Sequence, residues 1–300
     1  MVFVRRLQTL LLFSCFMLAG LVACSDAPNS VTAPAPDANE PLRVVTLAPH
    51  LAELVYAAGA GDTLVGVSAY SNYPEPVNDL PLIGDAFLID QEQLLLLRPD
   101  ILLAWQSGTA SHTVDELRAR GYRIKLIRTN GLNDIADALT SIGLLTGHQA
   151  MAESVAASFV ADIEQLRASY ADAEPIRVFY QIDSRPLYTA NGNHYVSELI
   201  ELCGGVNVFG DIGELAPLVS EEAVLVRDPE VMLAGRIVED ESPLSAWRRW
   251  PTLSANILDN YFYIPADLLA RPTPRLVQAG QKICEALHQA RINRVQRIDR

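Results

Sequence analysis

Apolar and polar residues alternate along this chain in a pattern typical of strands followed by helices. The β-branched run at 43–47 predicts a strand, and the helix expected after it carries apolar residues at helical spacing until Gly59. Asp90 is placed to cap a later helix, which ends before Pro99. The run at 101–105 is apolar without interruption, which predicts a strand buried on both faces. Strands that alternate with helices predict a parallel α/β sheet.

A long helix is expected to separate two such regions. From His148 to Tyr170 the chain holds no Pro or Gly, and apolar residues recur at helical spacing. This pattern predicts a helix of about 23 residues and ~35 Å. The strand pattern returns at 177–181. We therefore predict an α/β fold of two Rossmann-like lobes joined by a single long helix. The expected divisions are a first lobe at 42–146, the connecting helix at 147–174, a second lobe at 175–292 and a tail at 293–300.

The N-terminal segment is typical of an export signal. Arg5 and Arg6 precede an apolar stretch at 7–23, which ends in small residues directly before Cys24. This order is similar to a bacterial lipoprotein signal, in which the cysteine is lipidated and becomes the first mature residue. A membrane-spanning anchor is the alternative, but this stretch is interrupted by polar residues and is shorter than the ~20 residues that span a bilayer. We therefore expect export to the periplasmic side, with removal of residues 1–23 and a lipid on Cys24.

Residues 24–41 are rich in Ala, Pro, Asp and Ser without apolar periodicity, which predicts a disordered tether. The whole chain has 23 basic and 36 acidic residues and a net charge of −13. Residues 1–23 hold two arginines and no acid, so the remaining chain has a charge of −15. Phosphate binding needs a basic surface, and this charge therefore excludes nucleic acid as a partner.

The cysteines divide by position. Cys15 lies in the segment expected to be removed and Cys24 is expected to carry lipid, which leaves Cys203 and Cys284. In an oxidising compartment an even pair favours a disulfide, with two separate buried thiols as the alternative. A bridge between them would close a long loop. In the chain-entropy model this closure stabilises the folded state by about 4–4.5 kcal/mol.

Motifs of common enzymes are absent from the sequence. The chain holds no G-x-S-x-G elbow, P-loop, G-x-G-x-x-G or H-E-x-x-H motif. We therefore expect a binding protein with no enzymatic activity, no cofactor and no metal.

Several segments resemble the substrate-binding proteins of ABC importers for cobalamin, haem and iron-siderophores. The segments are RVVTLAP at 43–49, VGVSAYSNYP at 65–74, LRPD at 97–100 and CGGVNVF at 203–209. Several of them are similar to the vitamin B12-binding branch, and the resemblance covers about residues 42–290. It implies a class III periplasmic-binding-protein fold, a monomer, and a ligand held between the lobes: cobalamin or a related corrinoid.

The resemblance also assigns ligand-binding residues. Tyr70 and Trp105 each follow a predicted strand, and the resemblance implies that their rings hold the corrin; packing in the core is the alternative. Asp267 and Arg271 match an acid and an arginine that reach corrin side-chain amides, a role compatible with a local ion pair. The family has a Trp close to the position of Phe87, and we expect Phe87 to take part in binding.

Two acids are expected to form a docking face. Glu92 and Glu222 each lie in the first turn of a predicted helix, where the helix dipole alone favours an acid. In the family, one Glu from each lobe meets arginines of the two permease subunits, and both positions match here. The expected partners are therefore an ABC importer permease with its ATPase, a corrinoid and, through the lipid anchor, a membrane.

His50 supports an alternative hypothesis. It follows the first predicted strand, and related haem and metal receptors use His or Tyr as ligands. A haem or iron-siderophore receptor of the same fold class, with His50 as the haem or metal ligand beside Tyr70, is the second hypothesis. A lipoprotein that acts only as a structural partner is the third, which no residue specifically favours.

Overall fold

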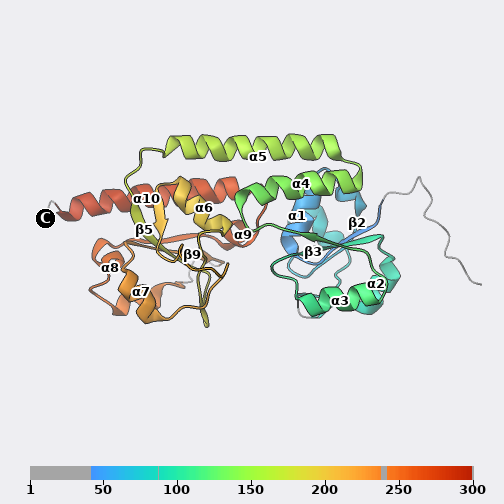
Figure 1. Cartoon of the computed structure of the whole chain (residues 1–300), viewed down its shortest axis with the longest axis horizontal. Helices are drawn as coiled ribbons and strands as arrows, with labels where there is room; N and C mark the ends of the chain where they lie inside the picture. The colour runs from blue at the N-terminus through green and yellow to red at the C-terminus, as the bar shows by residue number, and fades with distance from the viewer. Residues whose placement is uncertain (1–41, 87, 238–241, 299–300) are drawn as a thin grey trace, which may run out of the picture. The chain divides into compact units, whose positions relative to one another are not determined.

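The computed structural model describes residues 42–86, 88–237 and 242–298 (Figure 1). The expected export signal, Cys24 and the tether lie outside these residues, and so does Phe87. Within the described ranges, no helix is both long enough and apolar enough to cross a membrane.

Two four-stranded sheets, each with all of its strands parallel, form the framework of the described chain. The first contains, in spatial order, β2 (Leu64–Val67), β1 (Val44–Thr46), β3 (Ile101–Trp105) and β4 (Ile124–Ile127). The second contains β10 (Tyr261–Pro265), β9 (Val231–Arg236), β5 (Ile176–Gln181) and β8 (Gly205–Asn207). A short hairpin of β6 (Asp183–Ser184) and β7 (Leu187–Tyr188) follows β5. The predicted parallel α/β organisation is confirmed.

Helices alternate with the strands in both halves. Those of the first half are α1 (Pro49–Ala57), α2 (Gln91–Leu97), α3 (Ser111–Ala119) and α4 (Leu132–Thr146). Those of the second are α6 (Tyr195–Leu202), α7 (Glu221–Arg227), α8 (Ser254–Leu258), α9 (Ala266–Ala270) and α10 (Leu276–Ile298). Between them in sequence lies α5 (Gln149–Ser169). Short 3₁₀ turns occupy Gly61–Thr63, Glu75–Asp79 and Ser245–Arg249.

The predicted long helix is α5, which has 21 residues and packs along α4 (Figure 1). Gly147, with a φ of 79°, caps α4 in the left-handed conformation and lets the chain reverse. Gly143 permits the close approach of the two helices, because a Cβ there would lie 2.2 Å from the Cβ of Ala152. Phe159 and Ile163 of α5 belong to one buried cluster with residues of both sheets. The long helix therefore ties both halves to a shared core.

A helix–loop–strand unit occurs once in each half, as α2 with β3 and as α7 with β9. The predicted cap Asp90 accepts a hydrogen bond from the Gln93 amide, and Ser220 does the same for α7. Both helices end in a left-handed residue, Arg98 or Asp228, directly before a proline. The two halves therefore share the same backbone conformation between a helix and the buried strand that follows it.

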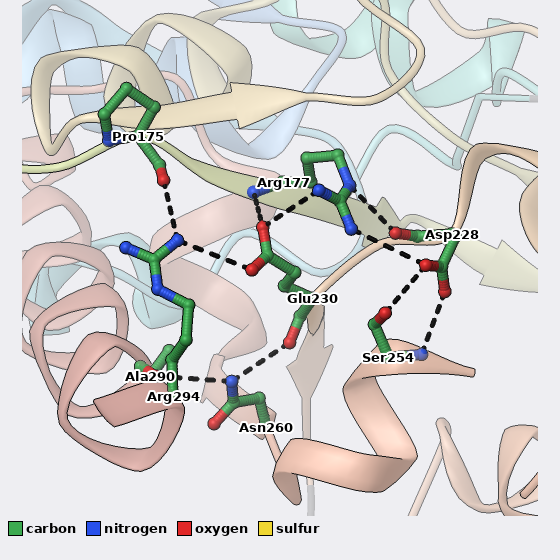
Figure 2. A network of polar contacts seen from close by, with 8 residues as sticks. All are labelled: Pro175, Arg177, Asp228, Glu230, Ser254, Asn260, Ala290 and Arg294. Carbon is green, nitrogen blue, oxygen red and sulfur yellow. Dashed lines mark hydrogen bonds and ion pairs between the residues drawn. The ribbon is translucent and has the colours of Figure 1, made fainter. Parts of the chain in front are cut away.

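The same unit carries an acid at the start of its strand, half-buried in the first half of the chain and buried in the second. Asp100 accepts a hydrogen bond from the Arg43 amide at 2.8 Å, and Glu230 accepts one from the Arg177 amide at 3.1 Å. Figure 2 shows the second of these, in which the Arg177 side chain also contacts Glu230 and Asp228. In each half an arginine and an acid thus join the amino ends of neighbouring strands.

The last helix runs further than the sequence pattern predicted. A tail was expected at 293–300, but α10 continues into this range as far as Ile298. Arg291 donates to the carbonyl of Cys203 at 2.7 Å, and Arg294 donates to the carbonyl of Pro175 at 3.1 Å (Figure 2). These bonds to backbone outside the helix hold its last turns against the second half.

The predicted disulfide between Cys203 and Cys284 is present. Both cysteines are fully buried, and the bridge joins the end of α6 to the middle of α10. It therefore links the helix that carries the C-terminus to the body of the second half.

Removing this bridge should lower stability without changing the fold. Replacement of both cysteines by alanine should reduce the free energy of unfolding by about 4 kcal/mol, because the bridge closes a long loop in the unfolded chain. Urea denaturation of the natural protein and of the double variant, with and without reductant, measures this loss. Equal stability of the two proteins under oxidising conditions would contradict it.

Candidate functional site

A pocket of about 390 Å³ lies at the carboxyl ends of β1, β2 and β3. In a parallel sheet these ends are where ligands commonly bind. The wall opposite the strands comes from α9 and the residue after it. The lining residues are Leu47, Ala48, Pro49, His50, Ser68, Ala69, Tyr70, Asp85, Ala86, Trp105, Gly108, Thr109, Asp267, Ala270 and Arg271.

Trp105 ends β3 and forms one apolar wall of the pocket. Its ring lies directly over Gly108, where an added Cβ would come 1.8 Å from a ring carbon. The turn is held by Thr109, whose hydroxyl accepts a hydrogen bond from the Trp105 amide at 3.1 Å. The indole nitrogen is buried and has no hydrogen-bond partner among the described residues. Gly108 therefore determines where the ring can lie.

Tyr70 presents its ring to the solvent side of the pocket, with 80% of the residue exposed. Its φ of 67° places it in the left-handed region, which is costly for a residue with a side chain. The Tyr70 carbonyl accepts a hydrogen bond from Nη2 of Arg271 at 2.9 Å. A contact from the opposite wall of the pocket thus supports an unfavourable backbone conformation.

Arg271 is buried and makes several contacts with the first half of the chain. Its Nη1 donates to Oε1 of Glu53 at 2.8 Å and to Oδ1 of Asn72 at 2.7 Å. Asp267, which lies four residues earlier and is largely exposed, approaches Nη2 of Arg271 at 3.5 Å. The guanidinium is therefore in part a structural group, while the Asp267 carboxylate remains accessible from the pocket.

His50 is the haem or metal ligand of the second hypothesis. It lies in the pocket wall but is buried. Its ring meets Trp105 edge-on, with 5.0 Å between the ring centroids. Burial, and secondarily the positive charge of Arg271, lowers the pKa of His50 to about 3, so the imidazole is neutral at physiological pH. Its Nε2 is inaccessible to solvent and finds no hydrogen-bond partner in the described structure.

The predicted ligand-binding residues thus meet at one pocket, and the predicted docking acids lie elsewhere. Tyr70, Trp105, Asp267 and Arg271 all line it, together with the alternative residue His50. Phe87 lies outside the described residues, although its neighbours Asp85 and Ala86 line the pocket. Glu92 and Glu222 are exposed on α2 and α7 and do not line it.

Sequence reasoning missed two groups at this site. Ser68 and Thr109 add hydroxyl groups to the lining, and their only signal was their place after a predicted strand. Glu53 and Arg275 lie behind the lining. Glu53 accepts hydrogen bonds from both Arg271 and Arg275. No spacing in the sequence indicates a contact between residues more than 200 positions apart.

The described residues do not form a metal site. Among residues 42–86, 88–237 and 242–298, no three His, Cys, Asp or Glu side chains gather closely enough to hold a metal ion.

Residues 44–244 match the periplasmic binding protein family. The chain belongs to this family. It is 37% identical over 246 residues to the vitamin B12-binding protein of Vibrio cholerae serotype O1, which covers 82% of this chain and 88% of that protein. The vitamin B12-binding protein of Yersinia pestis is 35% identical, with 82% and 86% covered.

Solved structures of other periplasmic binding proteins share the fold. The periplasmic vitamin B12 binding protein BtuF of Vibrio cholerae matches with a TM-score of 0.76 and 36% identity, over 84% of this chain and 98% of that one. The haem-binding protein RhuT of Roseiflexus sp. RS-1 matches with a TM-score of 0.73 and 23% identity, over 84% and 99%. These likenesses confirm the predicted class III periplasmic-binding-protein fold.

The buried neutral His50 should make this periplasmic binding protein sensitive to acid. The unfolded chain binds a proton at His50 below about pH 6.5, whereas the folded chain does so only near pH 3. The free energy of unfolding therefore falls as pH decreases through this window. Between pH 7 and pH 5 it should fall by about 2 kcal/mol more in the natural protein than in His50→Gln.

Urea denaturation of both proteins at a series of pH values measures this difference. His194, which burial shifts in the same direction, is present in both proteins and cancels in the comparison. Parallel pH profiles for the two proteins would contradict a buried neutral His50.

Proposed function

We propose that this periplasmic binding protein captures cobalamin or a related corrinoid and delivers it to an ABC importer. The observation that carries this proposal is the assembly of Tyr70, Trp105, Asp267 and Arg271 around one pocket. The choice of ligand is supported by the relatives named as vitamin B12-binding proteins, which cover most of the chain. The chain itself makes and breaks no bond in this scheme, and ATP hydrolysis belongs to the importer.

The chemistry of the pocket suits a large ring with polar side groups. The Trp105 and Tyr70 rings offer flat apolar surface at little conformational cost. Corrin amides need both donors and acceptors, which Arg271 and Asp267 supply. Because the Asp267–Arg271 contact is long at 3.5 Å, a ligand amide can bond to both groups without breaking a tight ion pair. We propose these four residues, together with Phe87, as the ligand-binding set.

We also propose that Glu92 and Glu222 dock the protein on the two permease subunits. They occupy the same position in the two helix–loop–strand units, directly after the first residue of a seven-residue helix. Four residues further on, each helix exposes an apolar side chain, Leu96 at 69% and Val226 at 85%. Hydrogen bonds from its own amide and from Ser220 lower the pKa of Glu222, which keeps it charged. An exposed acid beside an exposed apolar residue in each half suits a partner with two similar subunits.

The N-terminal pattern supports a lipid anchor for this receptor. We propose that residues 1–23 are removed on export and that Cys24 is lipidated. A tether at 24–41 then holds the binding domain close to its importer, which raises the effective concentration of one for the other.

Calorimetry of the lipid-free domain with cyanocobalamin, cobinamide and haemin tests the proposed ligand. We expect corrinoid binding, and we expect Trp105→Ala to weaken it roughly tenfold because stacking on the indole is lost. Trp250→Ala is the control, since Trp250 packs on the core of the second half away from the pocket, and its affinity should be unchanged. Tight haemin binding without corrinoid binding would instead support the second hypothesis.

Charge removal tests docking separately from capture. Glu92→Ala combined with Glu222→Ala should leave corrinoid affinity unchanged and impair corrinoid uptake by cells, because such charges set orientation and encounter rate. The control replaces two exposed acids on other helices, Glu164 of α5 and Glu285 of α10, by alanine and should leave uptake intact. Normal uptake with the Glu92/Glu222 double variant would refute the docking role.

A further inference from the structure

The wall of the pocket that carries Tyr70 is held in place by an ion-pair cluster, in which Arg271 lines the pocket and Glu53 and Arg275 lie behind it. We propose that Glu53 and Arg275 are positioning residues for corrinoid binding: with Arg271 they fix the backbone of residues 70–73 and so the place of the Tyr70 ring. This inference rests on the proposed function for its affinity measurements. Its structural part can be tested without any ligand.

Glu53 is the centre of the cluster. It belongs to α1, and only 3% of its side chain is exposed. Its Oε1 accepts hydrogen bonds from Nη1 of Arg271 at 2.8 Å and from Nη2 of Arg275 at 2.6 Å. Its Oε2 accepts a third, from Nε of Arg275 at 3.0 Å. One buried carboxylate thus orients two guanidinium groups that come from the segment between α9 and α10.

The two arginines then hold the segment that carries the pocket wall. Arg271 donates to the carbonyl of Tyr70 at 2.9 Å and to the side chain of Asn72 at 2.7 Å. Arg275 lies over the ring of Tyr73, with its guanidinium carbon 4.2 Å from the ring centroid. Residues 70–73 are therefore contacted at three points by arginine groups, and the orientation of these groups depends on Glu53.

Tyr70 needs such support because its backbone conformation is unfavourable. A tyrosine at φ 67° relaxes to an ordinary conformation unless surrounding contacts hold it. The residue is 80% exposed, so packing around the ring does not supply those contacts. The hydrogen bond from Arg271 to the Tyr70 carbonyl does. Loss of the Glu53 carboxylate removes the acidic partner of the partly buried Arg275 and leaves the buried Arg271 with the longer contact to Asp267, and the two guanidinium groups then reorient.

Glu230 provides a matched control. It is also a buried carboxylate, 8% exposed, and it also contacts two arginines, Arg177 and Arg294 (Figure 2). It lies at the amino ends of the strands of the second half and does not line the pocket. Glu230→Gln therefore removes the same charge from a similar environment without touching residues 70–73.

The first measurement is hydrogen exchange of the ligand-free domain, followed by mass spectrometry of the segment 68–74. Glu53→Gln and Arg275→Gln should each increase exchange in this segment, and Glu230→Gln should leave it unchanged. Arg275→Gln is the second variant in case Glu53→Gln does not fold. Exchange in 68–74 that matches the natural protein in the folded variants would overturn the positioning role.

The second measurement is a double-mutant cycle on cyanocobalamin affinity. Glu53→Gln and Arg275→Gln should each weaken binding about tenfold in the natural background, and should have little further effect when Tyr70 is already alanine. An undiminished effect in the Tyr70→Ala background would overturn the inference, because the cluster would then act by another route. If the natural protein binds no corrinoid, the proposed function fails, while the exchange measurement still decides the positioning role.

Discussion

The arrangement of the pocket depends on a buried carboxylate that two arginines share. Glu53 comes from the first half of the chain, and Arg271 and Arg275 come from the segment that follows the last strand of the second half. Charges removed from water are stable only when they are paired and fully hydrogen-bonded, so the burial of Glu53 and Arg271 depends on their pairing, which the partly buried Arg275 completes. Their pairing brings the α9 segment against the carboxyl ends of the first sheet, and the pocket forms where the two meet.

The same local unit serves different purposes in the two halves. α2 with β3 and α7 with β9 share caps, a left-handed helix end and, at the start of the strand, an acid that accepts a hydrogen bond from the backbone of the neighbouring strand. Trp105 of β3 and Gly235 of β9 occupy equivalent positions near the ends of their strands. The indole forms a wall of the pocket, whereas Gly235 has no side chain and packs against Ala266 of α9, which lies 3.4 Å from the position of a Cβ at 235. The second half therefore places a helix where the first half places an aromatic ring.

Elements and site residues were predictable to different extents. Apolar periodicity located the strands and α5, and Asp90 marked the start of α2, because these signals act within a few residues of each other. The end of α10 was not predictable, because Arg291 and Arg294 hold it through carbonyls that are distant in sequence. Placement after a strand was enough to bring Tyr70 and Trp105 to the pocket, since parallel strands end at the same edge. It gave no indication that the imidazole of His50 is buried against Trp105.

By itself the sequence determined the parallel α/β organisation, the long helix between the halves, the pairing of Cys203 with Cys284 and the kinds of side chain offered at the strand ends. These follow from periodicity, composition and order along the chain, which are local or additive properties. Only the tertiary structure decided that Arg271 is largely occupied by Glu53, Asn72 and the Tyr70 carbonyl. The partners of a residue depend on which surfaces pack together. A buried charged group must pair with a group close to it in space, and that group can lie far away in sequence.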